Sequence, residues 1–228
     1  MAQKQANVFN LKFVMDQFSK AVTDNDTDIC LEDYCVGYGE LSNLLDALGK
    51  IMYFVLRDVS KKLEILNNLR DPKISPDYFE NFVSVSKMCS FETSQYENNK
   101  PVGKLFTSGS RNLLRLHRAL IFIIYLFERI CTEPEEKTLC ELAQSAYEET
   151  LANHHSWVVR NAVTVAFHAL PYRQQFIEKM VAVQPADTQL TTIEACRDFL
   201  LKQGIPALKK AYDVTEAIFK KFDMLNLP

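Results

Sequence analysis

The chain has 228 residues, of which 47% are hydrophobic and 24% are charged, and these proportions exclude a disordered or fibrous protein. The formal net charge of −3 excludes a global basic field that would attract nucleic acid, so any bound anion must be held by a local cluster of cations. The six cysteines include no Cys-x-x-Cys pair, which argues against a zinc site and indicates free thiols in a reducing compartment.

Hydrophobic residues recur at helical spacing along almost the whole chain, and no stretch alternates cleanly enough to predict a strand. Asp28 is the expected cap of the second helix and Ser110 that of the fifth, whereas the polar stretch 91–110 is expected to be a long loop. The pattern predicts one all-α domain over residues 1–228. In chain order its expected helices begin near Phe9 and then cover about 31–48, 49–69, 76–88, 111–131, 136–152, 156–170, 171–183, 191–202 and 206–222.

The longest apolar run, residues 119–127 (ALIFIIYLF), is well short of the ~20 residues that a membrane span needs. We therefore expect it to form a helix that is buried on all sides. The N-terminal segment has no uninterrupted apolar stretch typical of a signal peptide, because Lys12 and Asp16 break it. A soluble, cytosolic protein is the resulting expectation.

Three arginines stand at the start of this apolar helix, where spacings of four and three place Arg111, Arg115 and Arg118 on one face. Cations beside a buried helix are costly unless an anion meets them. From the helix alone, two interpretations have equal weight. The arginines form salt bridges with Asp and Glu residues of the chain, or they bind a phosphate, whose geometry matches the guanidinium group and to which the helix N-terminus adds partial positive charge.

Two further polar patterns interrupt apolar helices. Asp58 and Lys62 are four residues apart and alone would indicate an ordinary exposed ion pair. His154-His155-Ser156-Trp157 contains the single Trp of the chain, but adjacent histidines diverge around a helix and no third ligand follows at zinc spacing, so no metal is expected. Asp58 and His155 could make a catalytic dyad. However, no nucleophile motif or glycine-rich phosphate loop accompanies them, so we expect neither enzymatic turnover nor a cofactor.

The order and spacing of these motifs resemble the glycolipid transfer protein family, and more closely its ceramide-1-phosphate transfer branch. The resemblance covers nearly the whole chain. The segments that carry it are Phe9-Asn-Leu-Lys12, Leu48-Gly49, Asp58-Val59, Lys62-Leu63, Leu66 to Arg70, Leu114-Arg115-Leu-His-Arg118, His155-x-Trp157-Val-Val-Arg160, Ala162 to Phe167, Leu170-Pro171 and Leu225-Asn-Leu-Pro228.

This resemblance implies an all-α fold, a two-layer helical sandwich that encloses a hydrophobic lipid pocket, with a headgroup centre on the surface. It implies that Asp58 accepts a hydrogen bond from the ceramide amide and that His155 donates one to the acyl carbonyl. Trp157 is expected to pack beneath this centre. Aliphatic and aromatic residues of the central helices either wall this pocket or belong to the ordinary core, namely Phe54, Leu114, Ile121, Phe122, Val158, Ala162 and Phe167.

The resemblance also implies how the headgroup is chosen. Glycolipid-selective members carry Trp where Arg115 stands, whereas Arg115 with Arg111 and Lys62 would surround a phosphate. The phosphate branch uses a further Arg in the preceding loop, where this chain offers Lys100 and Lys104 instead. The matching basic residue Arg118 is either a peripheral contact of the phosphate or a salt-bridge partner, and we favour the salt bridge.

The resulting hypothesis is non-catalytic transfer of ceramide-1-phosphate between membranes by a monomer that touches the bilayer transiently. Transfer of a glycosylceramide is the alternative in the same class, and the absence of Trp at position 115 argues against it. A different class, a sphingolipid-sensing protein whose occupancy is detected by a partner, stays open. A role in binding nucleic acid has little support from the net charge.

Overall fold

The computed structural model describes residues 9–47, 52–97 and 108–227. Two strands, β1 (Val22–Thr23) and β2 (Asp28–Ile29), form a short antiparallel hairpin that the sequence did not predict. The rest of the secondary structure is helical, as predicted. Its helices are α1 (Leu11–Ala21), α2 (Leu31–Ala47), α3 (Tyr53–Arg70), α4 (Val85–Glu97), α5 (Gly109–Thr132), α6 (Leu139–Glu149), α7 (Trp157–His168), α8 (Arg173–Ala182), α9 (Ile193–Phe199) and α10 (Ile205–Lys221).

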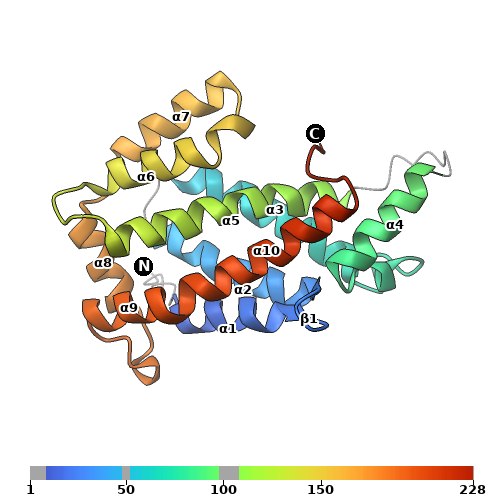
Figure 1. Cartoon of the computed structure of the whole chain (residues 1–228), viewed down its shortest axis with the longest axis horizontal. Coiled ribbons are helices and arrows are strands. Elements are labelled where there is room, and N and C mark those ends of the chain that lie inside the picture. Colours follow the sequence, from blue (N-terminus) through green and yellow to red (C-terminus); the bar gives the residue numbers. More distant parts are fainter. Residues whose placement is uncertain (1–8, 48–51, 98–107, 228) are drawn as a thin grey trace, which may run out of the picture.

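The helices are arranged in two layers (Figure 1). Helices α5 and α10 run side by side, and α5 also contacts α3 and α6, while α1 packs against both α2 and α10. Helix α7 lies at the edge of the molecule and packs mainly against α6. This arrangement confirms the predicted all-α, two-layer architecture. In the part of the chain that the structure describes, no helix is long and apolar enough to cross a membrane.

One stripe of α5 is fully buried, because Leu113, Leu120, Ile124 and Phe127 all face the main core. In the apolar run 119–127, however, Ile121, Phe122, Ile123, Tyr125 and Leu126 are only half-buried. The expectation that this helix is buried on all sides is therefore wrong. A helix within one of two layers has neighbours beside and beneath it, but its outer surface faces solvent.

The start of α5 differs from the sequence expectation. Helix α4 continues to Glu97, inside the stretch predicted to be a loop, and residues 98–107 lie outside the described part. The cap of α5 is Ser108, whose side chain accepts a hydrogen bond from the amide of Arg111, whereas Ser110 is fully buried within the helix. The packing around Gly109 is close, since a Cβ at this position would lie 2.7 Å from the sulfur of Met88 and 3.0 Å from the ring of Phe82, so these side chains would have to move.

Most other helix boundaries fall close to their predicted positions. The fourth helix, expected over 76–88, is wrong, because a 3-10 helix (Phe79–Phe82) occupies part of that range and α4 begins only at Val85. Ser156 caps α7, and Thr138 forms a capping box with Glu141 at the start of α6. Asp28 does not cap the second helix, because its carboxylate instead accepts hydrogen bonds from the amides of Ile29 and Ser86 near the start of α4. A π-helical segment (Leu200–Gly204) joins α9 to α10, and the predicted boundary at Leu48-Gly49 lies outside the described residues.

Candidate functional site

Asp58 and Lys62 form an ion pair on α3 that is asymmetric in its exposure. The Lys62 side chain is 7% exposed, whereas that of Asp58 is 66% exposed. The ammonium group also lies 3.5 Å from the main-chain carbonyl of Asp58. This pair is thus not the ordinary solvated pair that the spacing alone indicated, because one of its two charges has been removed from water.

The arginines near the start of α5, a helix that packs against α3, differ in their surroundings. Arg115 is exposed, while Arg111 is half-buried and its Nε atom is buried without a hydrogen-bond partner in the described structure. Among the described residues, neither Arg111 nor Arg115 takes part in a salt bridge. The structure therefore does not support the interpretation of these two arginines as structural salt bridges.

Arg118 is anchored in a way that the sequence did not predict. Its guanidinium donates a hydrogen bond of 2.6 Å to the main-chain carbonyl of Leu225, and no salt bridge to it is recorded within the described ranges. Burial lowers its pKa, the adjacent Arg115 lowers it further, and Glu216 opposes both effects. Among the described residues, a neutral carbonyl of the C-terminal segment therefore holds this cation in place of the favoured salt bridge.

The amides at the start of α5 are not available to an anion from solvent. The buried carboxylate of Glu92 accepts hydrogen bonds from the Gly109 and Ser110 amides at 2.6 and 3.2 Å, and Ser108 Oγ accepts one from the Arg111 amide at 3.1 Å. The expected contribution of the helix N-terminus to phosphate binding is therefore wrong. The sequence missed Glu92 because it lies in the stretch assigned to a loop.

His155 lies just before α7 and is half-buried. Its Nδ1 atom is 2.8 Å from the hydroxyl of Tyr147 on α6. Burial lowers the pKa of His155, the neighbouring His154 lowers it further, and the negative charge of Asp58 opposes this shift. The histidine is consequently neutral near pH 7 and lies within electrostatic range of Asp58.

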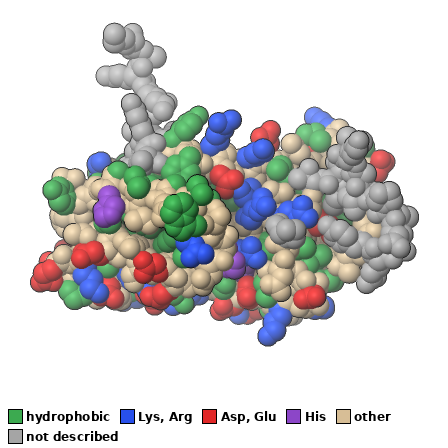
Figure 2. Space-filling model, turned by 90° about the horizontal axis from the view of Figure 1, so that it is seen from above, with side chains coloured by type: hydrophobic (Ala, Val, Ile, Leu, Met, Phe, Trp, Pro, Cys, Tyr) green, Lys and Arg blue, Asp and Glu red, His purple; other side chains and the backbone are tan. Residues whose placement is uncertain are grey.

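Trp157 does not pack beneath this centre, because it is 75% exposed. Val158 and Val165 of the same helix are 68% and 67% exposed, so α7 presents an apolar surface to solvent. Figure 2, which views the top of the molecule where α7 lies, shows hydrophobic side chains gathered beside a group of Lys and Arg side chains. The expectation for Trp157 is wrong because α7 packs mainly against α6 and leaves its outer face uncovered.

The expected pocket walls divide into two groups. Leu114 and Phe167 are buried, and Ile121 and Phe122 are half-buried. The other three are exposed in this structure, namely Phe54 of α3 and Val158 and Ala162 of α7. Large apolar side chains exposed together on α7 are typical of a surface that a ligand, a membrane or a partner covers.

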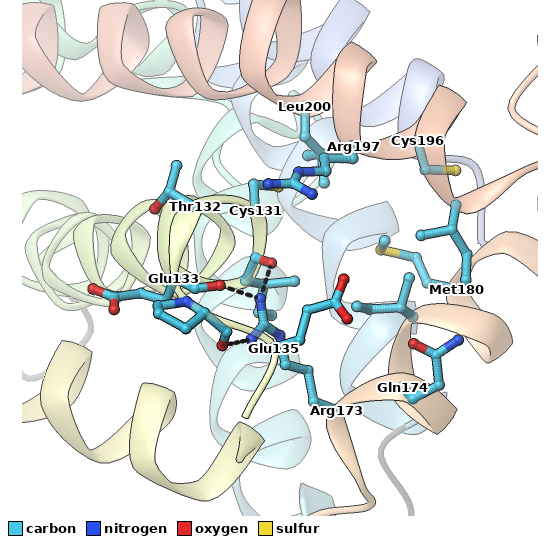
Figure 3. Close-up of a pocket in the computed structure, with 14 residues that line it drawn as sticks. Cys131, Thr132, Glu133, Glu135, Arg173, Gln174, Met180, Cys196, Arg197 and Leu200 are labelled. Atoms are coloured by element: carbon cyan, nitrogen blue, oxygen red, sulfur yellow. Dashed lines mark hydrogen bonds between the residues drawn. The ribbon is translucent and has the colours of Figure 1, made fainter. Parts of the chain in front are cut away.

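A separate hollow of about 520 Å³ lies at the opposite end of α5, between α5, α8 and α9 (Figure 3). None of the expected site residues lines it. Arg173 projects into this hollow and donates hydrogen bonds to the carbonyls of Ile130 and Glu133 at 2.7 and 2.9 Å and to that of Pro134, so its cation caps the C-terminus of α5. The hollow is about 30 Å from Arg111, given a rise of about 1.5 Å per helical residue.

Two further features of the described residues bear on the chemistry. No group of three or more His, Cys, Asp or Glu side chains with the geometry of a metal site is found there. All six cysteines are free thiols, as predicted, and four of them are buried.

Residues 29–182 match the family model described as Glycolipid transfer protein (GLTP). The chain is 33% identical over 224 residues to a zebrafish (Danio rerio) protein named "Ceramide-1-phosphate transfer protein", covering 98% of this chain and 100% of that protein. The crystal structure of the mouse ceramide-1-phosphate transfer protein in its apo form superimposes with a TM-score of 0.82 at 35% identity, covering 96% of this chain and 100% of that one.

The human ceramide-1-phosphate transfer protein, solved in complex with 12:0 ceramide-1-phosphate, superimposes with a TM-score of 0.81 at 32% identity and covers the same shares of the two chains. These matches extend over almost the full length of the chain and agree in fold and in sequence. The chain belongs to the glycolipid transfer protein family, in its ceramide-1-phosphate transfer branch.

Proposed function

We propose that this protein carries ceramide-1-phosphate between membranes through the cytosol, without chemical change to the lipid. The observation that carries the proposal is the Nε atom of Arg111, which is buried without a hydrogen-bond partner. Arg115, one turn further along α5, and the buried Lys62 of α3, a helix that packs against α5, are proposed to complete the phosphate site. A buried donor without an acceptor costs roughly 1–3 kcal/mol, which a bound phosphate would offset. Three cations around one position fit the charge of a phosphate monoester better than that of a neutral sugar.

The ceramide amide is proposed to bind between Asp58 and His155. When the Tyr147 hydroxyl donates to Nδ1 of His155, the ring carries its proton on Nε2, which can then donate to the acyl carbonyl. The exposed carboxylate of Asp58 would accept from the amide N–H. Both polar groups of the amide would be paired as the lipid leaves the bilayer, which avoids the cost of burying them unpaired.

The hydrocarbon chains make the exchange of such a lipid slow without a carrier. Each methylene exposed to water costs about 0.8 kcal/mol, so two chains of roughly 16 carbons amount to about 25 kcal/mol. We propose that the apolar side chains between α3 and α7 line the chains in the loaded protein. Exposure of Phe54 and Val158 supports this, because a surface that receives hydrocarbon must be reachable from the bilayer.

The exposed face of α7 is the proposed membrane contact. Trp157 is suited to this role, because an indole ring prefers the boundary between hydrocarbon and water. This contact would be transient and would bring the cationic centre to the level of the lipid headgroups. The protein is proposed to act as a monomer.

A lipid sensor is the second candidate function, and the same exposed α7 face favours it, since a partner protein could cover this surface in one state of occupancy only. Transfer and sensing differ in what is measured. A sensor binds the lipid without moving it between vesicles, and its partner distinguishes the empty from the loaded protein.

The decisive experiment compares the transfer of fluorescent ceramide-1-phosphate and fluorescent galactosylceramide between vesicles. Wild type should transfer the phosphorylated lipid, and Arg115→Leu should reduce that rate by about one to two decades, because a charge-assisted hydrogen bond contributes roughly 1.5–3 kcal/mol. Arg197→Leu, an exposed arginine on α9, is the matched control and should change neither rate. Failure of wild type to transfer either lipid would contradict the proposal.

Phosphatidic acid tests the role of Asp58 separately. A diacylglycerol ester has no amide N–H for this carboxylate to accept from, so phosphatidic acid should be transferred much more slowly than ceramide-1-phosphate. Equal rates for the two lipids would contradict the assignment of Asp58 and leave the phosphate site intact.

A further inference from the structure

Glu92 is a fully buried carboxylate on α4 that contacts the first turn of α5. It is 0% exposed, and it accepts hydrogen bonds from Ser108 Oγ at 2.7 Å and from the amides of Gly109 and Ser110 at 2.6 and 3.2 Å. Burial raises its pKa, while these three donors oppose the shift. A buried carboxylate is costly to maintain, so its complete set of partners indicates a specific structural task.

Ser108 connects this carboxylate to Arg111. The Ser108 hydroxyl donates to Glu92, and the same oxygen accepts from the main-chain amide of Arg111 at 3.1 Å. The main-chain carbonyl of Ser108 also accepts a hydrogen bond of 2.8 Å from the side chain of Asn112. The amides of Gly109 and Ser110 thus bind Glu92 directly, and the amide of Arg111 binds Ser108, whose hydroxyl in turn binds Glu92.

This arrangement has two consequences for the proposed phosphate site. The direction in which the Arg111 side chain leaves the helix is set by a turn that Glu92 fixes from the buried side. In addition, the amides face inward and do not bind a headgroup, so selection of the phosphate is left to Arg111, Arg115 and Lys62.

We propose that Glu92 is a positioning residue of the phosphate site, which acts through Ser108 to hold Arg111 in the orientation that meets the lipid phosphate. This inference rests on the proposed function. It concerns the orientation of the Arg111 side chain. It predicts that loss of Glu92 lowers the rate of transfer only for the phosphorylated lipid, and only when Arg111 is present.

A double-mutant cycle on ceramide-1-phosphate transfer tests this role. Arg111→Leu should reduce the rate by one to two decades, and Glu92→Ala by about tenfold. If Glu92 acts through Arg111, the double variant should be within about threefold of Arg111→Leu alone. Losses that multiply would overturn the positioning role, whereas an ineffective Arg111→Leu would overturn the proposed phosphate site itself.

Two variants separate orientation from folding. Glu92→Gln keeps an oxygen that accepts from the Gly109 and Ser110 amides, so it should retain transfer within about threefold of wild type. Ser108→Ala removes the hydroxyl that links Glu92 to the Arg111 amide, leaves the hydrogen bonds from Gly109 and Ser110 to Glu92 in place, and should lose transfer specifically for the phosphorylated lipid. It also replaces Glu92→Ala in the cycle if that variant does not fold, as judged by circular dichroism and thermal unfolding.

Asp28→Ala is the matched control, because Asp28 is also a buried carboxylate that accepts main-chain hydrogen bonds near a helix start, in this case α4. It should lower the thermal unfolding midpoint by an amount similar to Glu92→Ala without changing the ceramide-1-phosphate transfer rate of the folded protein. An equal loss of transfer in Asp28→Ala, or a Glu92→Gln variant as impaired as Glu92→Ala, would overturn the proposal.

Discussion

Helices α5 and α7 are both rich in large apolar residues, yet the structure treats them in opposite ways. In α5, Leu120 and Ile124 are 0% exposed, and in α7, Val158 and Val165 are more than two-thirds exposed. Helix α5 has neighbours in α3, α4, α6 and α10, whereas α7 packs mainly against α6. Apolar composition therefore favours the burial of a helix against a nonpolar surface. The number of neighbouring helices determines whether the folded chain itself supplies that surface.

The polar groups at the N-termini of α5 and α7 also differ. The start of α5 is fixed by a buried carboxylate and its hydrogen bonds, whereas α7 has a simple serine cap. We infer that α5 is the rigid frame of the site and that α7 is the surface kept available for hydrocarbon. Four predictions test this contrast, from the largest expected effect to the smallest.

Truncation of one large side chain on each helix should give very different losses of stability. Phe127→Ala should lower the free energy of unfolding by about 3–5 kcal/mol, because it removes a fully buried ring from the core of α5. Val165→Ala on α7 should change it by less than about 0.5 kcal/mol, because the side chain is exposed. Urea unfolding measures both. A loss above about 2 kcal/mol for Val165→Ala would mean that the α7 face is covered in solution.

A methyl group added at Gly109, in the first turn of α5, should lower the stability of the protein. Gly109→Ala places a Cβ 2.7 Å from the Met88 sulfur and 3.0 Å from the Phe82 ring, which should cost about 1–3 kcal/mol of stability and reduce transfer by displacing Arg111. Gly39→Ala is the control, since a Cβ there meets nothing within 4 Å and a helical alanine should stabilise the fold by up to about 1 kcal/mol. Equal unfolding midpoints for the two variants would contradict the close packing.

The exposed tryptophan should matter for membrane contact and not for folding. Trp157→Ala should reduce vesicle binding and transfer by about tenfold, because part of an indole's burial in the interface contributes about 1.4 kcal/mol. Its unfolding free energy should stay within about 0.5 kcal/mol of wild type. Phe13→Ala, which removes an exposed ring on α1, is the control and should leave vesicle binding unchanged. Sedimentation with vesicles and urea unfolding measure the two effects.

The smallest effect concerns pH. His117 of α5 is buried, donates from Nε2 to Glu216 across 2.6 Å and stacks on Tyr212. Burial lowers the pKa of His117 below the usual 6.5, although Glu216 opposes the shift. Between pH 6.5 and the lower pKa of the folded protein, the unfolded chain therefore binds more protons than the folded one. Its contribution to stability is complete above pH 6.5 and is lost as the pH falls toward the folded pKa.

The urea midpoint should consequently fall between pH 7 and pH 5.5, and His117→Gln should reduce this dependence. Burial also lowers the pKa of His154 and His155 at the α7 side, so part of the dependence should persist in the variant. His168→Gln, an exposed histidine at the end of α7, is the control. An unchanged slope in His117→Gln would contradict the buried neutral imidazole.

The sequence anticipated much of the fold because helices leave a local signal. The 3.6-residue spacing of apolar side chains, together with caps such as Ser156, predicted most helix boundaries within a few residues. It failed in two places. Asp28 accepts a hydrogen bond near the start of α4 rather than capping the second helix, through a contact between segments far apart in the chain that no local pattern contains. The cap of α5 is Ser108 rather than Ser110, two local candidates two residues apart, and the carboxylate of Glu92 holds the amides of Gly109 and Ser110 in this turn.

For the candidate site, residue types and spacing predict that Arg111 and Arg115 share one face of a helix and that Asp58 and Lys62 share a face of another, because that depends on helical geometry alone. Only the tertiary structure decided that Lys62 is buried, that Glu92 occupies the amides of α5, that Arg118 binds the Leu225 carbonyl and that Trp157 faces solvent. The physical reason is the same in each case. Helix formation is a local balance of hydrogen bonds and side-chain spacing, whereas burial and the pairing of polar groups depend on which helices meet in the folded chain.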